Sequence, residues 1–202
     1  VVEDFTGDGY LDVVATSRCL LEQARYYVNN GDGTFVARTV EAGLKGQTGS
    51  LYANQTDYNN DGRPDLYLAR GAWLGKAGRH PNSLLRNKGD GTFTDVTEEA
   101  GLLSFHPTQT AVWFDYNNDL LPDLLLVEQA ADRLFRSNGN GTFTEIVLSS
   151  DGLSQQPGGF GAAWADYDND GYPDLLVSRG ETGKKDRNAV LHGKAAGALE
   201  NY

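Results

Sequence analysis

The chain has 202 residues, 39% of them hydrophobic, which is enough for one large or two small domains with a packed core. Its 28 acidic and 17 basic residues give a net charge of −11, which argues against binding to nucleic acid or to anionic membrane surfaces. No apolar run approaches the length of a membrane span, and no signal peptide is visible. Because methionine is absent, we expect a processed or excerpted chain.

The first recognisable element is an acidic loop, which we call the first loop. It places side-chain oxygens at positions 1, 3, 5 and 9, from Asp4, Thr6, Asp8 and Asp12. Gly9 at position 6 permits a sharp turn, and Tyr10 at position 7 offers its backbone carbonyl. Hard oxygen donors at this spacing suit Ca²⁺ far better than zinc, which prefers nitrogen and sulfur.

The same pattern recurs three times. The predicted ligands of the second loop are Asp57, Asn59, Asp61, Arg63 (through its carbonyl) and Asp65. Those of the third loop are Asp115, Asn117, Asp119, Leu121 (through its carbonyl) and Asp123. Those of the fourth loop are Asp166, Asp168, Asp170, Tyr172 (through its carbonyl) and Asp174. Leu120 replaces the glycine of the third loop, so the backbone there bends at a cost or its site is weaker.

These loops have two other interpretations. Four polar turns that bind nothing would also be rich in Asp, Asn and Gly, but four copies in register favour metal binding. An EF-hand requires a bidentate Glu at position 12, where this chain has Ala15, Leu68, Leu126 and Val177. We therefore expect up to four Ca²⁺ ions, which would bring the net charge from −11 to −3 and make the fold depend on calcium.

The loops also define a repeat. Their first aspartates lie 53, 58 and 51 residues apart, a period typical of propellers or solenoids. In each unit an apolar segment leads into the loop and a second one follows it, as in 111–114 and 123–127, which predicts a hairpin closed by the loop. A third segment follows, predicted at 26–28, 83–86, 133–136 and 189–192.

A Gly-rich turn of hairpin type ends the third segment in the first three units, at 30–35, 88–93 and 138–143. Asp32 and Asp90 in these turns are interpreted as turn formers and not as metal ligands. A fourth strand follows, for example 93–97 and 143–147, and short acidic segments at 41–44 and 98–102 link the units. Four strands per unit predict an all-β protein built from β-propeller blades of four antiparallel strands.

The second loop and the turn beginning at Arg86 resemble the FG-GAP or VCBS repeat family. These are calcium-binding propeller repeats, similar to those of integrin α-subunit heads, a fungal fruiting-body lectin and secreted relatives of cartilage acidic protein. The resemblance covers essentially the whole chain and implies the fold, the calcium and an extracellular location. It fixes function only weakly, because the family serves adhesion, glycan binding and, less often, enzyme scaffolds.

The predicted blades cover about 1–47, 50–104, 108–156 and 159–202 of one propeller. Val1 and Val2 supply only the tail of a first strand, and we expect the last fourth strand to begin only at Tyr202. Either the four blades close a small ring or, as we expect, they are part of a longer protein, for which the resemblance implies a seven-bladed ring. Open blade edges would then permit self-assembly.

Single residues outside the loops carry weaker signals. Cys19 is the only cysteine, so an intramolecular disulfide is excluded, and we expect it to be a small buried residue. Asn54 and Asn140 lie in glycosylation sequons. Trp113 and Trp164 are expected to pack between blades, whereas Trp73, in the long connection 71–81, is a candidate for surface contact.

No catalytic motif is visible. His80 and His106 each precede a proline in a variable connection and are expected to be solvated, and the obvious carboxylate clusters all belong to the loops. Our first hypothesis is a non-enzymatic adhesion or recognition module for glycan or extracellular protein. The alternatives are a structural subunit of an extracellular fibre or surface layer, and a non-catalytic part of a polysaccharide-degrading or phospholipase-like enzyme.

Overall fold

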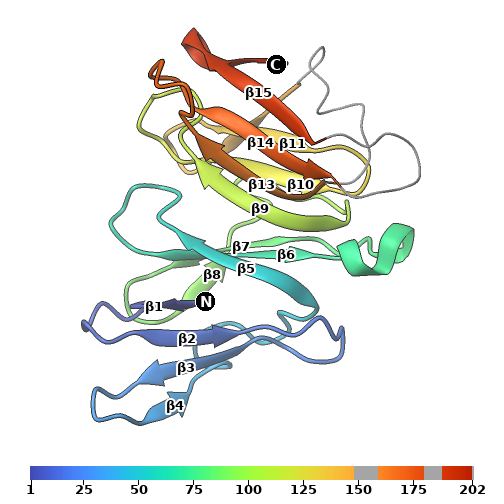
Figure 1. Cartoon of the computed structure of the whole chain (residues 1–202). Helices are drawn as coiled ribbons and strands as arrows, with labels where there is room; N and C mark the ends of the chain where they lie inside the picture. Colours follow the sequence, from blue (N-terminus) through green and yellow to red (C-terminus); the bar gives the residue numbers. More distant parts are fainter. Residues whose placement is uncertain (148–158, 180–187, 202) are drawn as a thin grey trace.

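The computed structural model describes residues 1–147, 159–179 and 188–201, and within them it is an all-β protein of four antiparallel sheets (Figure 1). Each sheet has four strands paired in chain order. The first sheet contains β1 (Val2–Glu3), β2 (Asp12–Ala15), β3 (Arg25–Asn29) and β4 (Phe35–Ala37). The second contains β5 (Ser50–Thr56), β6 (Asp65–Arg70), β7 (Ser83–Asn87) and β8 (Phe93–Asp95).

The third sheet contains β9 (Thr108–Phe114), β10 (Asp123–Glu128), β11 (Arg133–Ser137) and β12 (Phe143–Ile146). The fourth contains β13 (Gly159–Ala165), β14 (Asp174–Arg179), β15 (Ala189–Lys194) and β16 (Ala198–Asn201). Two short 3₁₀ helices, η1 (Ala72–Ala77) and η2 (Ala195–Gly197), complete the described elements. The predicted β-propeller blades are confirmed in these sheets.

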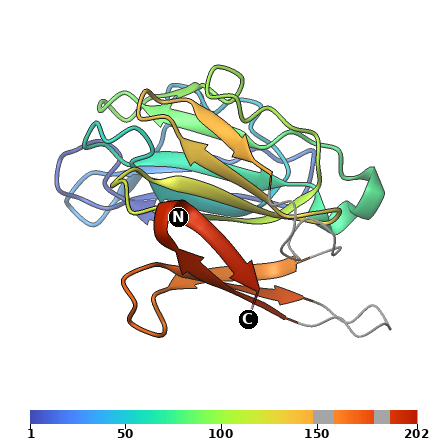
Figure 2. The same cartoon turned by 90° about the horizontal axis from the view of Figure 1, so that it is seen from above.

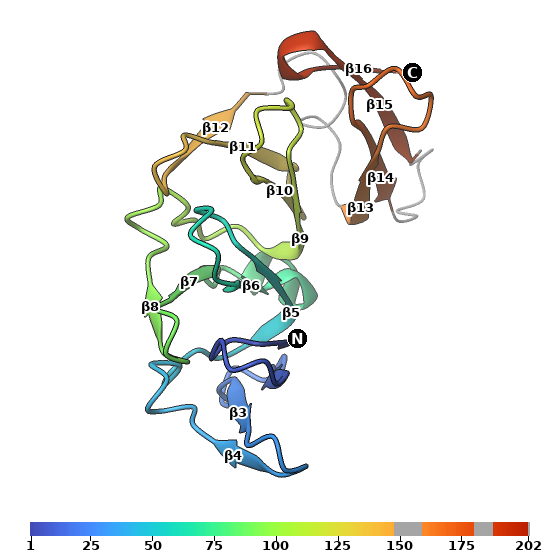
Figure 3. The ribbon, with the colours of Figure 1, turned by 90° about the vertical axis from the view of Figure 1, so that its left-hand side faces the viewer.

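The sheets stack face to face along an arc. In Figure 3 the first strands of the sheets, β5, β9 and β13, lie along the inner side of the arc, and β4, β8 and β12 lie along the outer side. Figure 2, seen from above, places the fourth sheet in front of the other three. All four loops join the first and second strands of a sheet, so they emerge at the same end of the molecule (Figure 1).

The Gly-rich turns form because their residues accept the required backbone geometry. Gly31 and Gly33 have φ of 73° and 86°, values that residues with a Cβ adopt only at a cost. Asp32 Oδ1 accepts hydrogen bonds from the backbone N and Oγ1 of Thr34 at 2.9 and 2.6 Å, and Asp90 does the same with Thr92. The prediction that these aspartates are turn formers is therefore confirmed.

The hydrophobic core lies between successive sheets. In the second strand of each sheet, side chains alternate between the faces, so the second residue after the position 9 aspartate points toward the next sheet. These residues are Val14, Tyr67 and Leu125, which are 1%, 0% and 0% exposed. Their counterpart in the fourth sheet is Leu176, which is 48% exposed because no described sheet covers that face. Packing between sheets is thus what buries the strands.

The two strand tryptophans lie where the sequence predicted. The Trp113 ring packs edge-on to Tyr67 with 5.8 Å between centroids, in the core between the second and third sheets. Trp164 packs against the core between the third and fourth sheets and stacks on Phe114 at 5.8 Å. Large rings on the first strands therefore fill the space between sheets, as expected.

Two sequence predictions are wrong. Cys19 is exposed, because it lies in the connection between β2 and β3, outside the packed sheets. The fourth strand of the last sheet does not begin at Tyr202: β16 pairs with β15 from Lys194↔Ala198 to Leu191↔Asn201. A 3₁₀ turn with Gly197 at φ of 73° replaces the usual Gly-rich sequence there.

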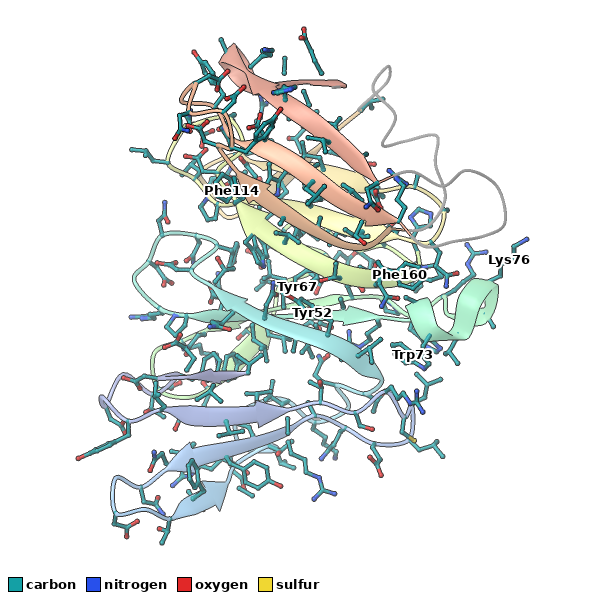
Figure 4. All side chains as sticks on the ribbon, viewed as in Figure 1. Tyr52, Tyr67, Trp73, Lys76, Phe114 and Phe160 are labelled. Carbon is teal, nitrogen blue, oxygen red and sulfur yellow. The ribbon has the colours of Figure 1, made fainter. Side chains whose placement is uncertain are left out.

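Trp73 and Lys76 lie on η1, which projects from the second sheet at the end opposite the loops (Figure 4). Trp73 is half-buried there, so part of its ring faces the solvent. No helix among the described residues is long and apolar enough to span a membrane.

Candidate metal-binding loops

The aspartate at position 1 organises each loop through backbone N–H groups. In the second loop, Asp57 Oδ1 accepts a hydrogen bond from the N–H of Asp61 at 2.9 Å, and Oδ2 accepts one from Gly62 at 2.7 Å. The corresponding bonds from positions 5 and 6 recur in the first, third and fourth loops at 2.7–3.2 Å, on Asp4, Asp115 and Asp166. The four loops therefore share one backbone conformation.

The third loop keeps this conformation despite its leucine. Leu120 has φ of 67°, and its N–H donates to Asp115 Oδ2 at 2.7 Å, as the glycine does elsewhere. The side chain is 85% exposed, so no packing compensates for the left-handed backbone. The strain is therefore of order 1–2 kcal/mol. Of the two alternatives predicted for Leu120, a backbone that bends at a cost or a weaker site, the structure has the bent backbone.

The aspartate at position 9 is buried and ties three segments together. Asp65 is 0% exposed; its Oδ2 accepts the N–H of Tyr58 at 3.3 Å, and its Oδ1 accepts that of Asn87, at the end of β7, at 2.7 Å. The same pair of bonds recurs at Asp12, Asp123 and Asp174. Position 9 thus joins the loop, the second strand and the third strand.

Burial gives this carboxyl group unusual electrostatics. It raises the pKa of Asp65 to about 7, against the lowering effect of the N–H donor of Asn87, and the nearby Asp61 and Asp57 raise it further. The pKa of Asp123 is raised to about 7 for the same reasons, with Asp119 and Asp115 as the neighbours. A divalent cation bound among these carboxyl groups would favour their charged forms and so oppose the rise in pKa.

The carboxylates converge most closely in the last two loops. Oxygens of Asp115, Asp119 and Asp123 lie within 4.8 Å of one another, as do those of Asp166, Asp168 and Asp170. Among the described residues, the carboxylates of the first and second loops form no triplet as close as these. The oxygen donors of all four loops fit a calcium ion by chemistry, since Ca²⁺ takes six to eight oxygen ligands in flexible geometry.

Position 3 differs between the loops. Asn59 and Asn117 each donate from Nδ2 to the position 5 carboxylate, at 3.1 and 2.9 Å, while Thr6 donates to Asp4 Oδ1 at 3.3 Å. The fourth loop alone has a carboxylate at this position, Asp168. It is therefore the most negatively charged of the four.

Sequence reasoning missed a histidine beside the fourth loop. His192 Nδ1, on β15, lies 3.4 Å from Asp168 Oδ2 and 3.5 Å from Asp174 Oδ1. The signal was weak because the residue is on the third strand and not in the loop. An alignment of the four third strands, by the residue that donates its N–H to the position 9 aspartate, would have placed His192 beside the fourth loop.

Sequence reasoning also missed a buried charged cluster at the opposite end of the sheets. Glu128 is 1% exposed, and its Oε2 lies 3.4 Å from Nδ1 of His106, which is half exposed as predicted. Asp132 forms an ion pair at 3.4 Å with Arg179 of the fourth sheet. Burial raises the pKa of Glu128 to about 7 and that of Asp132 to about 6, against the lowering effect of the neighbouring arginines.

The two sequons differ in accessibility. The Asn54 side chain is half-buried and donates to the backbone carbonyl of Ala111 in the next sheet at 3.0 Å. Asn140 lies exposed at a turn, where its Oδ1 accepts hydrogen bonds from the backbone N and Oγ1 of Thr142. Only the second amide therefore faces the solvent.

Comparison with known proteins defines the class. A model of the FG-GAP-like repeat matches residues 4–68, 57–126 and 115–177, each match running from one loop through the strand that follows the next. The chain therefore belongs to the FG-GAP repeat family, and its fold is that of a β-propeller assembled from these repeats.

The curated relatives include cartilage acidic protein 1 of Homo sapiens, 30% identical over 168 residues, and that of Xenopus tropicalis, 29% identical over 170 residues. These matches cover 76% and 77% of this chain but 24% and 25% of the relatives, so the chain spans about a quarter of their length. A solved structure of an Agrocybe aegerita lectin, described as recognising non-reducing terminal N-acetylglucosamine, is similar in fold with a TM-score of 0.54 and 22% identity. That match covers 98% of this chain and 49% of the lectin.

Proposed function

We propose that this chain is a calcium-stabilised extracellular recognition module, with no chemistry of its own, and that its ligands are glycans. In this proposal the loop residues at positions 1, 3, 5 and 9, with the carbonyl of position 7, hold structural Ca²⁺. The relatedness to cartilage acidic protein 1 supports an extracellular setting, and the lectin-like fold supports a binding role. The observation that carries glycan recognition is a polar hollow that recurs between successive sheets.

The first hollow, between the first and second sheets, has a volume of about 240 Å³ and is lined by polar side chains that include Thr6, Arg38, Glu41, Asp90 and Thr92. The second hollow, between the second and third sheets, has a volume of about 280 Å³, and its polar lining includes Asn59, Arg86, Glu99, Asn140 and Thr142. Each is built from a loop and third strand of one sheet and the Gly-rich turn of the next.

This lining suits a ligand rich in hydroxyl groups. Guanidinium groups donate hydrogen bonds, carboxylates accept them, and threonine hydroxyls do both. Tyr58 also lines the second hollow, but it is 3% exposed and offers only a small part of its ring there. The volumes lie just below the range of drug-sized pockets, which begins at about 300 Å³, so a single sugar unit is the expected occupant.

The proposed calcium sites and the hollows share residues. Thr6 and Asn59, which line the first and second hollows, are the predicted position 3 ligands of the first and second loops. Removing the cation would therefore release a side chain from the wall of each hollow. Glycan binding is expected to require Ca²⁺ even though the ion does not contact the sugar.

The test is a glycan array that includes N-acetylglucosamine-terminated glycans, followed by titration of the best ligand. Arg86→Ala should weaken binding roughly tenfold or more, the loss expected when a charged hydrogen bond worth about 1.5 kcal/mol is removed. Lys88→Ala, an exposed cation nearby that lines neither hollow, should bind normally. Absence of any glycan ligand in Ca²⁺, or equal binding by Arg86→Ala, would contradict the proposal.

A second candidate function is structural assembly, and one face of the fourth sheet, which no described sheet covers, favours it. That face has a hollow of about 450 Å³ lined by Ala163, Ala165, Tyr167, Leu176 and Val190, among others. In the other sheets the equivalent face is buried against the first and third residues after the position 9 aspartate of the next sheet, for example Leu66 and Leu68 against the first sheet.

The first sheet of a second copy would present Val13 and Ala15 at those two positions, and Ala15 is exposed. Head-to-tail stacking of copies would therefore reproduce an interface the chain already contains. Sedimentation at rising concentration should then show association that Leu176→Glu abolishes. A wild-type chain that stays monomeric at all concentrations would exclude this candidate.

A further inference from the structure

The fourth loop has a nitrogen donor that its three counterparts lack. The imidazole Nδ1 of His192 and carboxylate oxygens of Asp168 and Asp174 all lie within 4.8 Å of one another. The His192 and Asp174 side chains are 16% and 4% exposed, and that of Asp168 is 35% exposed. The three groups therefore form a compact cluster at the edge of the loop, open to solvent on the Asp168 side.

Each sheet has a residue that corresponds to His192. It directly precedes the third-strand residue whose backbone N–H donates to the position 9 aspartate. These donors are Asn29, Asn87, Ser137 and Gly193. The residues before them are therefore Val28, Arg86, Arg136 and His192. Neither valine nor a permanently charged arginine can ligate a metal, so a third-strand ligand is available only beside the fourth loop.

The distances are those of ligands around a small metal ion. Zinc binds imidazole nitrogen and carboxylate oxygen at about 2.0–2.2 Å, which in tetrahedral geometry places two donors about 3.4 Å apart. His192 Nδ1 lies 3.4 and 3.5 Å from the two carboxylate oxygens.

The other ring nitrogen has a partner that suits the same role. Tyr167 Oη lies 2.8 Å from His192 Nε2, within hydrogen-bond distance, and farther, at 3.5 Å, from Nδ1. A ligating histidine almost always uses its second nitrogen as a donor to a neighbouring group, which fixes the ring and the tautomer. With the proton on Nε2, the Nδ1 lone pair faces the carboxylates of Asp168 and Asp174 and is available as a metal ligand.

We propose that the fourth loop binds Zn²⁺ in preference to Ca²⁺, through His192 Nδ1 and carboxylate oxygens of Asp168 and Asp174, with Tyr167 as a positioning residue. Imidazole is a favourable ligand for zinc, whereas Ca²⁺ takes oxygen donors. The inference rests on the proposed metal-binding role of the fourth loop, and it does not depend on calcium in the other three.

The experiment is a calorimetric titration of the full chain with ZnCl₂ in a buffer containing excess Ca²⁺. Wild-type protein should bind one Zn²⁺ per chain through this site. His192→Arg should weaken that binding at least about 100-fold, since a zinc ligand is lost and the loss of a mere supporting group already costs 10–100-fold. Arginine occupies this position in two sister sheets, so the variant is expected to fold.

Two further variants sharpen the test. Tyr167→Phe should weaken Zn²⁺ binding about 10–100-fold while keeping the stoichiometry. His106→Ala, which removes an exposed histidine at the opposite end of the sheets, should leave the titration unchanged. Substituting Co²⁺ for Zn²⁺ should give visible absorption bands of a nitrogen-ligated site in the wild type and none in His192→Arg.

No Zn²⁺ binding in the presence of Ca²⁺, or equal binding by wild type and His192→Arg, would overturn the inference. Thermal unfolding of both proteins in Ca²⁺ and in chelator separates this failure from that of the proposed function. Stabilisation by Ca²⁺ without Zn²⁺ binding would remove only the zinc site. Zn²⁺ binding lost in His192→Arg, without stabilisation by Ca²⁺, would leave the zinc site standing and remove calcium from the proposed function.

Discussion

Leu120 occupies a backbone conformation that the other three loops reserve for glycine. Its φ of 67° compares with 88°, 80° and 88° at Gly9, Gly62 and Gly171. Its side chain reaches into solvent, so the strain is local and uncompensated. A single residue can therefore test how the loop geometry contributes to stability.

Leu120→Gly should stabilise the protein by about 0.5–1 kcal/mol. Relief of left-handed strain contributes about 1–2 kcal/mol, and the greater freedom of glycine in the unfolded chain offsets part of it. Urea unfolding in chelator measures the change without metal. The reciprocal variant Gly62→Leu, at a site where an added Cβ would meet no atom within 4 Å, should destabilise by a similar amount. If neither substitution changed the free energy of unfolding, the conformation would not be strained.

Glu128 makes stability depend on pH near neutrality. Its pKa in the folded protein, about 7, lies above the ordinary value of 4.5 because the side chain is buried. As pH rises from about 4.5 to 7, the unfolded chain releases this proton first, so the native state loses stability, on the order of 2 kcal/mol.

Glu128→Gln should remove this part of the pH dependence, and its stability relative to wild type should rise between pH 4.5 and 7. Unfolding free energies at several pH values check the difference. The exposed Glu98→Gln is the control and should track the wild type. Parallel curves for Glu128→Gln and wild type would show that the carboxyl group keeps an ordinary pKa.

At the scale of the element, each hairpin is joined to its third strand by one buried carboxylate. Asp65 accepts N–H groups from the loop and from the end of β7, whereas Asp61, in the exposed part of the loop, accepts the N–H of Arg63 at 3.0 Å. The two aspartates thus differ in what they hold together, although both are predicted ligands.

Asp65→Asn should destabilise the protein by about 2–3 kcal/mol even in chelator, because one buried N–H would face an amide N–H₂ group in place of an acceptor oxygen. Asp61→Ala should cost at most about 1 kcal/mol in chelator and considerably more in Ca²⁺, where it also removes a ligand. Unfolding in both buffers distinguishes the two. Equal losses for Asp61→Ala in Ca²⁺ and chelator would reject its assignment as a ligand.

The hairpins were predictable because their signals are local. Alternating apolar segments around an acidic loop specify β9, β10 and the turn between them within about twenty residues. The turn before β16 lacks the usual Gly-rich sequence, so pairing with β15, and not turn chemistry, sets that strand. Its existence could not be deduced from the turn.

The candidate site was predictable only where its residues are contiguous. Asp166, Asp168, Asp170 and Asp174 lie in one loop, whereas His192 reaches them only because β15 pairs with β14. The ion pair between Asp132 and Arg179 joins different sheets and likewise depends on how the sheets stack. Exposure of Cys19 follows from a connection whose path no local pattern specified.

At the scale of the whole molecule, the described sheets are held together by three hydrophobic cores, and the acidic residues are concentrated in the loops. The chain carries a net charge of −11, and thirteen aspartates occupy predicted ligand positions at one end of the stacked sheets. Without cations these carboxylates repel one another across neighbouring loops. Calcium bound only by the folded state would therefore stabilise the whole arc and not a single hairpin.

The most direct test of calcium binding is thermal unfolding in millimolar Ca²⁺, in chelator and in Mg²⁺. At a Ca²⁺ concentration about ten times the Kd, each occupied site adds about 1.4 kcal/mol, so the first three loops alone add about 4 kcal/mol and four Ca²⁺-filled loops add about 5–6 kcal/mol. Tm should therefore rise by about 10–20 °C. We predict this rise in Ca²⁺ and little change in Mg²⁺, which prefers strict octahedral geometry and keeps its waters. Equal Tm values in Ca²⁺ and chelator would mean that the loops are polar turns and would contradict the calcium proposal.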